Sequence, residues 1–158
     1  MFFKSKNDNT VLKSPIKGQI IKLENMKDQA FASGILGQGV GIWPTEGKVF
    51  SPINGTVTMI FPTSHAVSIR TDSGVTLLIH IGMDTVQLDG KFYKSHVKDG
   101  QRVKEGQLLI EFDLNGITNA GFNLETPIVV TNSDEFSNIT VCEKDNIEVG
   151  EDLLIISK

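Results

Sequence analysis

The stretch HAVSIRTDSGVTLLIHI, residues 65–81, decides the fold that this sequence predicts. Its two flanks, 66–70 and 75–81, are short apolar runs with many β-branched side chains, which favours strands over helices. Between the flanks stands TDSG, residues 71–74, whose polar and glycine residues are typical of a tight turn. The stretch therefore predicts a β-hairpin.

The open end of this hairpin carries two histidines. If the turn is symmetric about the bond between Asp72 and Ser73, His65 lies directly opposite His80. Directly opposed residues have Cβ atoms about 5 Å apart on one face of a sheet. The sequence thus predicts two imidazoles side by side on a rigid support.

Two neutral imidazoles at this spacing offer one nucleophilic nitrogen and one hydrogen-bond donor near neutral pH. That suits transfer of a phosphoryl group onto one ring while the other ring holds the phosphate oxygens. The pair also suits a metal site, but zinc needs at least three protein ligands, and Asp84 is the only nearby third candidate. A third interpretation is that His80 is a hydrogen-bonded core histidine within an apolar run.

The rest of the chain predicts further short strands. Alternating or apolar runs bounded by Gly, Asn, Asp or Pro occur at 19–23, 47–50, 56–61 and 108–112. Only 115–122 and 133–139 could hold a helical turn or two. The sequence therefore predicts an all-β protein, an antiparallel β-sandwich or partly closed barrel with short helical turns.

Composition limits the classes of function. The chain has 158 residues and a formal net charge of −4, which predicts about one domain and gives no positive surface for nucleic acid. The single Cys142 excludes an internal disulfide and a cysteine-rich metal site. The first residues are too polar for a signal sequence. We expect a flexible tail at 1–10, one domain at 11–158 and a cytoplasmic location.

Two internal echoes indicate pseudo-symmetric halves of one sheet system. SPIKGQI, residues 14–20, returns as SPINGTV, residues 51–57. DGQRVKEGQLLI, residues 99–110, returns more loosely as VGEDLLI, residues 149–155. The copies are too few and too diverged for a solenoid.

Several motifs of nucleotide and hydrolase chemistry are missing from the sequence. It has no P-loop, no Gly-x-Ser-x-Gly elbow and no His-Glu-x-x-His pair. GILGQGVG, residues 34–41, is glycine-rich, but no helical pattern follows it. We therefore expect a flexible or tightly turned loop there rather than a phosphate cradle. His96 lies among polar residues, which predicts an ordinary surface position.

Six motifs are spread along nearly the whole chain. The longest is IHIGMDTVQL, residues 79–88, around His80. The others are FPTSHA (61–66), DSGV (72–75), GQRVKEG (100–106), EFD (111–113) and TPIVVTN (126–132). Together they resemble one family, the glucose-type EIIA domains of the bacterial sugar phosphotransferase system.

The resemblance implies an antiparallel β-sandwich with a shallow site, and it assigns roles to the site residues. His80 would carry the phosphoryl group on Nε2, and His65 would support it as a donor to the phosphate oxygens. Thr63 matches the hydroxyl that hydrogen-bonds within the site. Asp84 matches an acidic residue beside the phosphohistidine that would meet a cationic side chain of a partner.

The resemblance also implies the partners. His80 would receive the phosphoryl group from the histidine phosphocarrier protein HPr and pass it to the EIIB domain of a membrane sugar permease. The domain would therefore meet the inner face of the membrane only transiently, bind no sugar directly and remain a monomer between encounters. Since the P–N bond already has a high transfer potential, no cofactor is required. We expect Val40, Phe61 and Val86 to form an apolar ring that excludes water from the docked complex.

The family can also hold a zinc ion between its two histidines, here His65 and His80, and a carboxylate of a partner. The isolated chain is not expected to need it. Gln38 departs from the glucose-transport branch, which has an acidic residue there. The loop at 32–39 looks more like EIIA domains fused to β-glucoside, sucrose or trehalose permeases. Regulatory partners of the glucose branch are therefore not carried over.

Two alternatives from other classes remain at this point. One is a biotinyl- or lipoyl-like carrier, because residues 97–108 resemble the turn-rich pattern of those shorter domains. Such a carrier needs a modified lysine at a hairpin tip, and only Lys27 faintly suggests one. The other is a metal-dependent hydrolase built on His65, His80 and Asp84.

Overall fold

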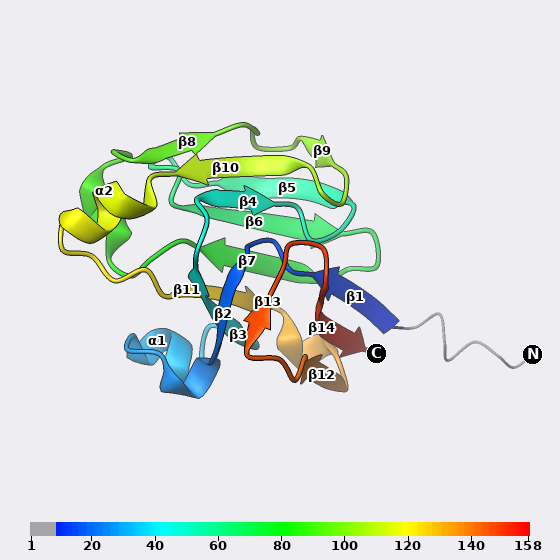
Figure 1. The fold of residues 1–158 in the computed structure, drawn as a ribbon. Helices are drawn as coiled ribbons and strands as arrows, with labels where there is room; N and C mark the ends of the chain where they lie inside the picture. The colour runs from blue at the N-terminus through cyan, green and yellow to red at the C-terminus, as the bar shows by residue number, and fades with distance from the viewer. Residues whose placement is uncertain (1–8) are drawn as a thin grey trace, which may run out of the picture.

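The computed structural model describes residues 9–158, and strands form most of the regular structure there (Figure 1). In chain order the strands are β1 (Asn9–Lys13), β2 (Gly18–Lys22), β3 (Gln38–Pro44), β4 (Lys48–Phe50), β5 (Gly55–Ile60), β6 (Ala66–Thr71), β7 (Thr76–His80), β8 (Tyr93–Ser95), β9 (Arg102–Val103), β10 (Leu108–Phe112), β11 (Thr126–Val130), β12 (Asn138–Val141), β13 (Asn146–Ile147) and β14 (Asp152–Ser157). The helical elements are η2 (Leu23–Asn25), α1 (Gln29–Ala32), η3 (Thr85–Leu88), α2 (Leu114–Asn119) and η4 (Ser133–Glu135).

The strands form one large sheet and two small ones. The large sheet has the order β13-β2-β3-β11-β7-β6-β5-β9, and the small sheets have the orders β1-β14-β12 and β4-β10-β8. Neighbouring strands pair antiparallel throughout. One apolar core contains side chains of all three sheets, such as Leu154, Ile110 and Ile79. The predicted all-β antiparallel sandwich is confirmed.

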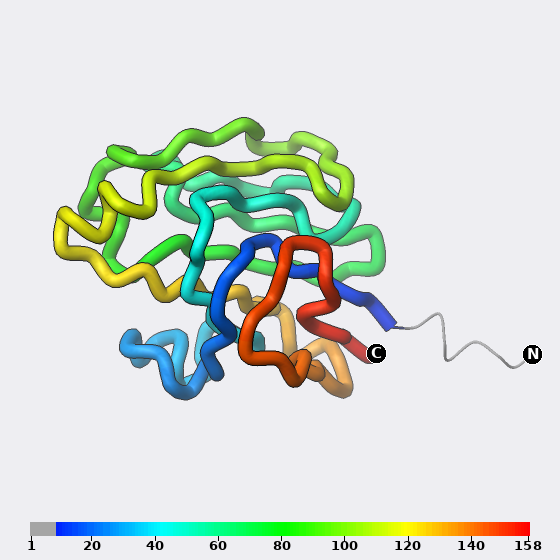
Figure 2. The backbone as a smooth tube through the Cα atoms, viewed as in Figure 1, coloured from blue at the N-terminus to red at the C-terminus, as the bar shows by residue number. Residues whose placement is uncertain are grey.

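The two ends of the described chain lie together. β1 pairs with β14 from Asn9 opposite Ser157 to Lys13 opposite Asp152, and the blue and red ends of the tube run side by side (Figure 2). Of the predicted tail at 1–10, residues 1–8 lie outside the described part, and the last two residues belong to β1. The regular structure therefore begins before the predicted start at residue 11.

The hairpin of β6 and β7 exists, but its predicted register was wrong by one residue. His80 pairs with Ala66, and Arg70 pairs with Thr76. The reason is a three-residue loop instead of a two-residue turn, because the Thr71 amide donates to the Val75 carbonyl and Gly74 takes a φ of 92°. Such a left-handed glycine is typical of three-residue hairpin loops.

Only the first half of the glycine-rich segment 34–41 forms a loop. Gly34 and Gly37 have positive φ and form the turn that was predicted, but the chain then enters β3 in the middle of the large sheet. A Cβ on Gly39 would lie 2.0 Å from the Ile128 carbonyl oxygen of the neighbouring strand β11. Glycine therefore serves close packing of strands here, and the prediction of a loop over 38–41 was wrong.

The two sequence echoes pair with each other in space. The Ser14 hydroxyl donates to the Ile16 carbonyl, and the Ser51 hydroxyl donates to the Ile53 carbonyl, both at 2.7 Å. The backbone carbonyl of Ser14 accepts from the amide of Gly150, and the backbone carbonyl of Ser51 accepts from the amide of Gly106. Each pair of echoes thus builds the same corner, which confirms the predicted pseudo-symmetry.

The predicted helical turns were right in part. The turn at 115–122 corresponds to α2, whereas 133–139 holds only the short η4 before β12 begins at Asn138. Helix α1 was not predicted. Its four residues are too few for a periodic pattern, and it begins at Asp28, whose carboxylate caps the Ala30 amide at 2.8 Å.

Candidate functional site

His80 ends strand β7, and the loop that follows fixes its imidazole. Its Nδ1 lies 2.8 Å from the carbonyl oxygen of Gly82. A carbonyl only accepts, so Nδ1 carries the proton of the neutral ring and Nε2 keeps its lone pair. Gly82 has a φ of 83°, and a Cβ there would lie 2.6 Å from Thr85 Cγ2. The loop therefore requires glycine at this position, and its carbonyl leaves Nε2 of His80 without a proton.

His65 lies next to His80 despite the corrected register. The two ring centroids are 4.9 Å apart, with the planes at 83°. His65 stands one residue before β6, and its carbonyl accepts from the Ile81 amide at 2.7 Å. The preceding residue, Ser64, has a left-handed φ of 58°. The proximity of the two imidazoles was predicted correctly, although the pairing that was used to predict it was not.

The His65 side chain is 3% exposed and is held by Thr63. The Thr63 hydroxyl lies 2.5 Å from Nδ1 of His65. A hydroxyl can donate or accept, so this contact admits either neutral tautomer of the ring. When the hydroxyl donates, Nε2 of His65 carries the proton and becomes a hydrogen-bond donor.

Burial keeps both imidazoles neutral at pH 7. It lowers the pKa of His65 from 6.5 to about 4, with a smaller contribution from neighbouring His80. Burial also lowers the pKa of His80. The hydrogen bond to the Gly82 carbonyl and the carboxylates of Asp28 and Asp84 oppose that change. Both rings therefore have free lone pairs in the resting protein.

Three aromatic rings surround the histidine pair. Phe31 of α1 packs against His80 at 5.5 Å between ring centroids, and Phe61 packs edge-on against His65 at 5.4 Å. Tyr93 lies 6.5 Å from His65, and its hydroxyl donates to the Ile81 carbonyl at 2.9 Å. Burial raises the pKa of Tyr93 to about 12, so this phenol stays a donor.

Two carboxylates act on His80, and only one of them was predicted. Asp84 is exposed and takes a left-handed φ of 60° immediately before η3. Asp28, the cap of α1, has a larger influence on the pKa of His80 than Asp84. An aspartate at the start of a helix is a recognisable capping signal, but nothing local placed this helix beside His80.

The predicted apolar ring is partly wrong. Val40 is 1% exposed and belongs to the core, because β3 lies inside the large sheet. Phe61 is half-buried, and Val86 on η3 is 55% exposed. Two exposed apolar residues that were not predicted, Ile35 and Leu36, lie in the turn between α1 and β3.

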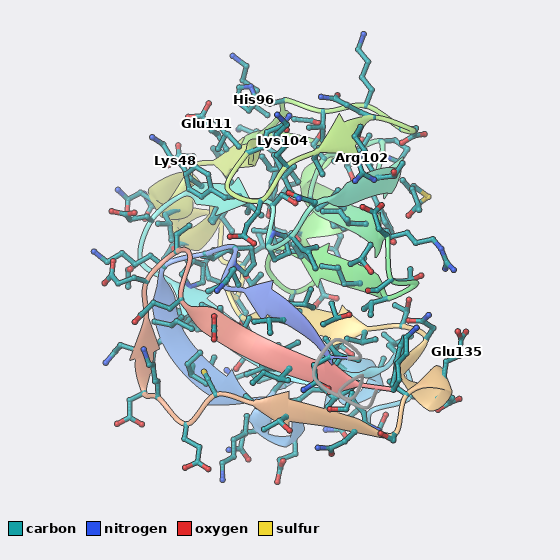
Figure 3. The ribbon with its side chains drawn as sticks, turned by 90° about the vertical axis from the view of Figure 1, so that its right-hand side faces the viewer. Lys48, His96, Arg102, Lys104, Glu111 and Glu135 are labelled. Carbon is teal, nitrogen blue, oxygen red and sulfur yellow. The ribbon has the colours of Figure 1, made fainter. Side chains whose placement is uncertain are left out.

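His96 contacts Glu111 and not the pair of His65 and His80. Its Nε2 lies 2.7 Å from Oε1 of Glu111, on the small sheet that contains β8 and β10 (Figure 3). Arg102 makes a two-pronged contact with Asp72 through 2.6 Å hydrogen bonds. The predicted surface position of His96 is confirmed.

The two alternative functions find no support. Within residues 9–158 no group of three or more His, Cys, Asp or Glu side chains is placed to hold a metal ion. Lys27 connects η2 to α1 and does not lie at a hairpin tip, as a cofactor-bearing lysine would. Over the same residues, no helix has both the length and the apolar character to cross a membrane.

Comparison with known proteins agrees with this geometry. The family model for the phosphoenolpyruvate-dependent sugar phosphotransferase system, EIIA 1, matches residues 10–136. The structure is similar to the glucose permease IIA from Mycoplasma capricolum, with a TM-score of 0.88 and 32% identity, over 98% of this chain and 99% of that one.

Two curated relatives differ in length. A β-glucoside-specific EIIBCA component of Halalkalibacterium halodurans is 48% identical over 93% of this chain, which spans only 23% of that protein. A glucose-specific EIIA component of Staphylococcus epidermidis is 42% identical over 98% of this chain and 95% of its own length. The chain therefore belongs to the EIIA 1 family of the phosphoenolpyruvate-dependent sugar phosphotransferase system.

Proposed function

We propose that the chain is a phosphoryl carrier in which His80 accepts a phosphoryl group on Nε2 from the phosphohistidine of HPr. It then passes the group to the EIIB domain of a sugar permease. The observation that carries this proposal is the 2.8 Å hydrogen bond from His80 Nδ1 to the Gly82 carbonyl, beside the neutral ring of His65. That bond leaves Nε2 unprotonated, which a nucleophile requires.

The chemistry at His80 is one exchange of P–N bonds. The bond between phosphorus and the donor imidazole breaks as the bond to Nε2 forms, and the donor ring keeps the electron pair. Positive charge develops on the His80 ring during this step. The Gly82 carbonyl, which accepts from Nδ1, and the carboxylates of Asp28 and Asp84 stabilise that charge. The transferred group needs alignment and no added energy source.

His65 is proposed to hold the phosphate oxygens. With the Thr63 hydroxyl donating to Nδ1, His65 Nε2–H becomes a donor close to His80 Nε2. Burial keeps the His65 ring neutral until the phosphoryl group arrives. Once the phosphoryl group is in place, its negative charge favours the protonated form of His65, which strengthens the contact.

Docking is proposed to use the exposed edge around the pair. Val86 on η3 and Ile35 and Leu36 in the turn after α1 are exposed apolar side chains, and they suit exclusion of water by a partner. Asp84 and Asp28 suit cationic partner side chains, which speed association and fix orientation. Both partners can use one surface because the carrier meets them in turn.

We propose a cytoplasmic carrier that reaches the inner face of the membrane only through the permease. It contacts no sugar, since the phosphoryl group leaves His80 for another protein. The described residues share one core, which supports a single folding unit. The named sugars of the relatives, glucose and β-glucosides, are the candidate substrates of the permease that this carrier serves.

The test is phosphorylation of purified His80→Ala and His80→Gln by phosphorylated HPr, followed by mass spectrometry at neutral and acid pH. The intact chain should gain an acid-labile phosphoryl adduct, and both variants should gain none while keeping the wild-type melting temperature within a few degrees. His96→Ala is the matched control and should be labelled like the wild type. Labelling of His80→Ala would move the acceptor elsewhere and contradict the proposal.

A further inference from the structure

The segment that carries α1 covers the outer side of the large sheet beside His80. Figure 1 shows α1 next to the end of β2 and the start of β3, and Phe31 packs against the ring of His80 at 5.5 Å between centroids. Its apolar contacts form a small second cluster with Met26, Met83 and Val129. Met26 fills the space above Gly41, where a Cβ would lie 2.9 Å from the methionine sulfur.

A buried carboxylate on a remote part of the chain holds this segment. Glu125 is only 7% exposed, and its Oε1 accepts from the Lys27 backbone amide at 3.0 Å, across 98 residues of sequence. A glutamate is rarely so buried unless it is hydrogen-bonded. The Lys27 amide directly precedes Asp28 and α1, so this bond sets where the helix begins.

The residues around Glu125 also hold the loop that orients His80. The Asn123 carbonyl accepts from the Met83 amide at 2.9 Å, and the Thr126 hydroxyl accepts from the Gly82 amide at 3.4 Å. Gly82 is the residue whose carbonyl accepts from His80 Nδ1. The stretch from 123 to 126 thus binds the His80 loop through its backbone and Thr126, and binds the α1 segment through Glu125.

We infer that Glu125 is a positioning residue, which ties the α1 segment to the His80 loop and so keeps Phe31 and Asp28 against the phosphoryl acceptor. The inference rests on the proposed function of His80. Glu125 is buried and accepts from the Lys27 amide, so it acts on the site through the α1 segment. The role depends on the hydrogen bond and not on charge as such, so glutamine, which has an accepting oxygen of the same reach, should fulfil it.

The experiment compares Glu125→Leu and Glu125→Ala with Glu125→Gln in the full chain. Glu24→Leu is the matched control, since it removes an exposed carboxylate from η2 on the same segment. Hydrogen exchange is measured at the Phe31 and Ala32 amides, which donate to Asp28. A nuclear Overhauser effect between the Phe31 and His80 rings reports their contact. Single-turnover labelling by phosphorylated HPr reports the reaction.

Exchange at Phe31 and Ala32 should rise about tenfold or more in Glu125→Leu, the change expected for leaving the Lys27 amide without its acceptor. Exchange in β7 should stay unchanged. The contact between the Phe31 and His80 rings should weaken, and labelling should slow in proportion to the closed fraction that is lost. Glu125→Gln and Glu24→Leu should behave like the wild type. If Glu125→Leu does not fold, Glu125→Ala decides the same points.

Unchanged exchange in Glu125→Leu would overturn the inference, as would faster exchange with an unchanged labelling rate. Glutamine failing like leucine would also overturn it, because the hydrogen bond would then not be the cause. If the wild type is not labelled at His80, the proposed function fails, whereas exchange and ring contact still report whether Glu125 holds the segment.

Discussion

The buried state of His65 predicts a specific loss of stability on acidification. The perturbation is to lower the pH from 7.5 to 4.5 for the wild type and for His65→Gln, which cannot take up a proton there. The pKa of His65 is about 4 in the folded protein and 6.5 in its ordinary state, with burial as the main cause. The unfolded chain therefore binds a proton that the folded chain refuses between these values.

The sign and size follow from proton linkage. Because the folded pKa is lowered, the contribution of His65 to stability is complete above pH 6.5 and is lost as the pH falls toward 4. At 1.36 kcal/mol per pKa unit, the loss is about 2 kcal/mol by pH 5 and about 3 kcal/mol by pH 4. His80 adds a loss of the same sign, since burial lowers its pKa as well.

The assay is urea denaturation at several pH values, followed by fluorescence of Trp43. The free energy of unfolding of the wild type should fall more steeply than that of His65→Gln, so that the two values converge by about 2 kcal/mol between pH 7.5 and pH 5.

Two results would refute this reasoning. One is a titration of His65 in the folded protein, followed by nuclear magnetic resonance, with a midpoint near 6.5. The other is a set of parallel stability curves for the wild type and His65→Gln over this pH range. Either would mean that the ring is hydrated enough to accept a proton, and that its neutral state at pH 7 does not depend on burial.

Three further predictions concern the rest of the site. His65→Gln should still accept the phosphoryl group from HPr but should transfer it to EIIB about 10²–10³-fold more slowly, because glutamine keeps a donor yet cannot change its protonation. Single-turnover rates of the two half-reactions check this, and failure of the first half-reaction would contradict the roles assigned to His65 and His80. Asp84→Asn should lower the association rate with HPr most at low salt, whereas Glu135→Gln, which removes a charge from η4, should not. Stopped-flow association at several ionic strengths measures this. Equal association rates for Asp84→Asn and the wild type would leave Asp84 as a turn residue. Gly82→Ala should lose more stability than Gly121→Ala, since both positions have positive φ but only Gly82 has an atom within 3 Å of the new Cβ. The backbone strain of alanine at positive φ, which both variants share, is about 1–2 kcal/mol. Equal losses of stability in urea denaturation would show that the loop at Gly82 adjusts to the new Cβ without cost.

The sequence was sufficient for the architecture and for the identity of the histidine pair. Alternation with period two and turn residues between apolar runs predict strands and hairpins, because they depend on local backbone conformation. The motif around His80 already contained Gly82 and Asp84, the two residues of the loop that follows β7. The repeated Ser-Pro-Ile segments predicted a pseudo-symmetry that the hydrogen bonds of Ser14 and Ser51 confirm.

Only the tertiary structure decided the surroundings of the pair. One added residue in the loop at Gly74 moved the register of β6 and β7, yet the ring centroids of His65 and His80 lie 4.9 Å apart. A valine at position 40 is compatible with an exposed apolar ring and with the core. Its burial depends on which strands flank β3. The contact of Glu125 with Lys27 spans 98 residues. Such contacts depend on how separate segments pack, which no local pattern of residues encodes, whereas strands and turns follow from the neighbours along the chain.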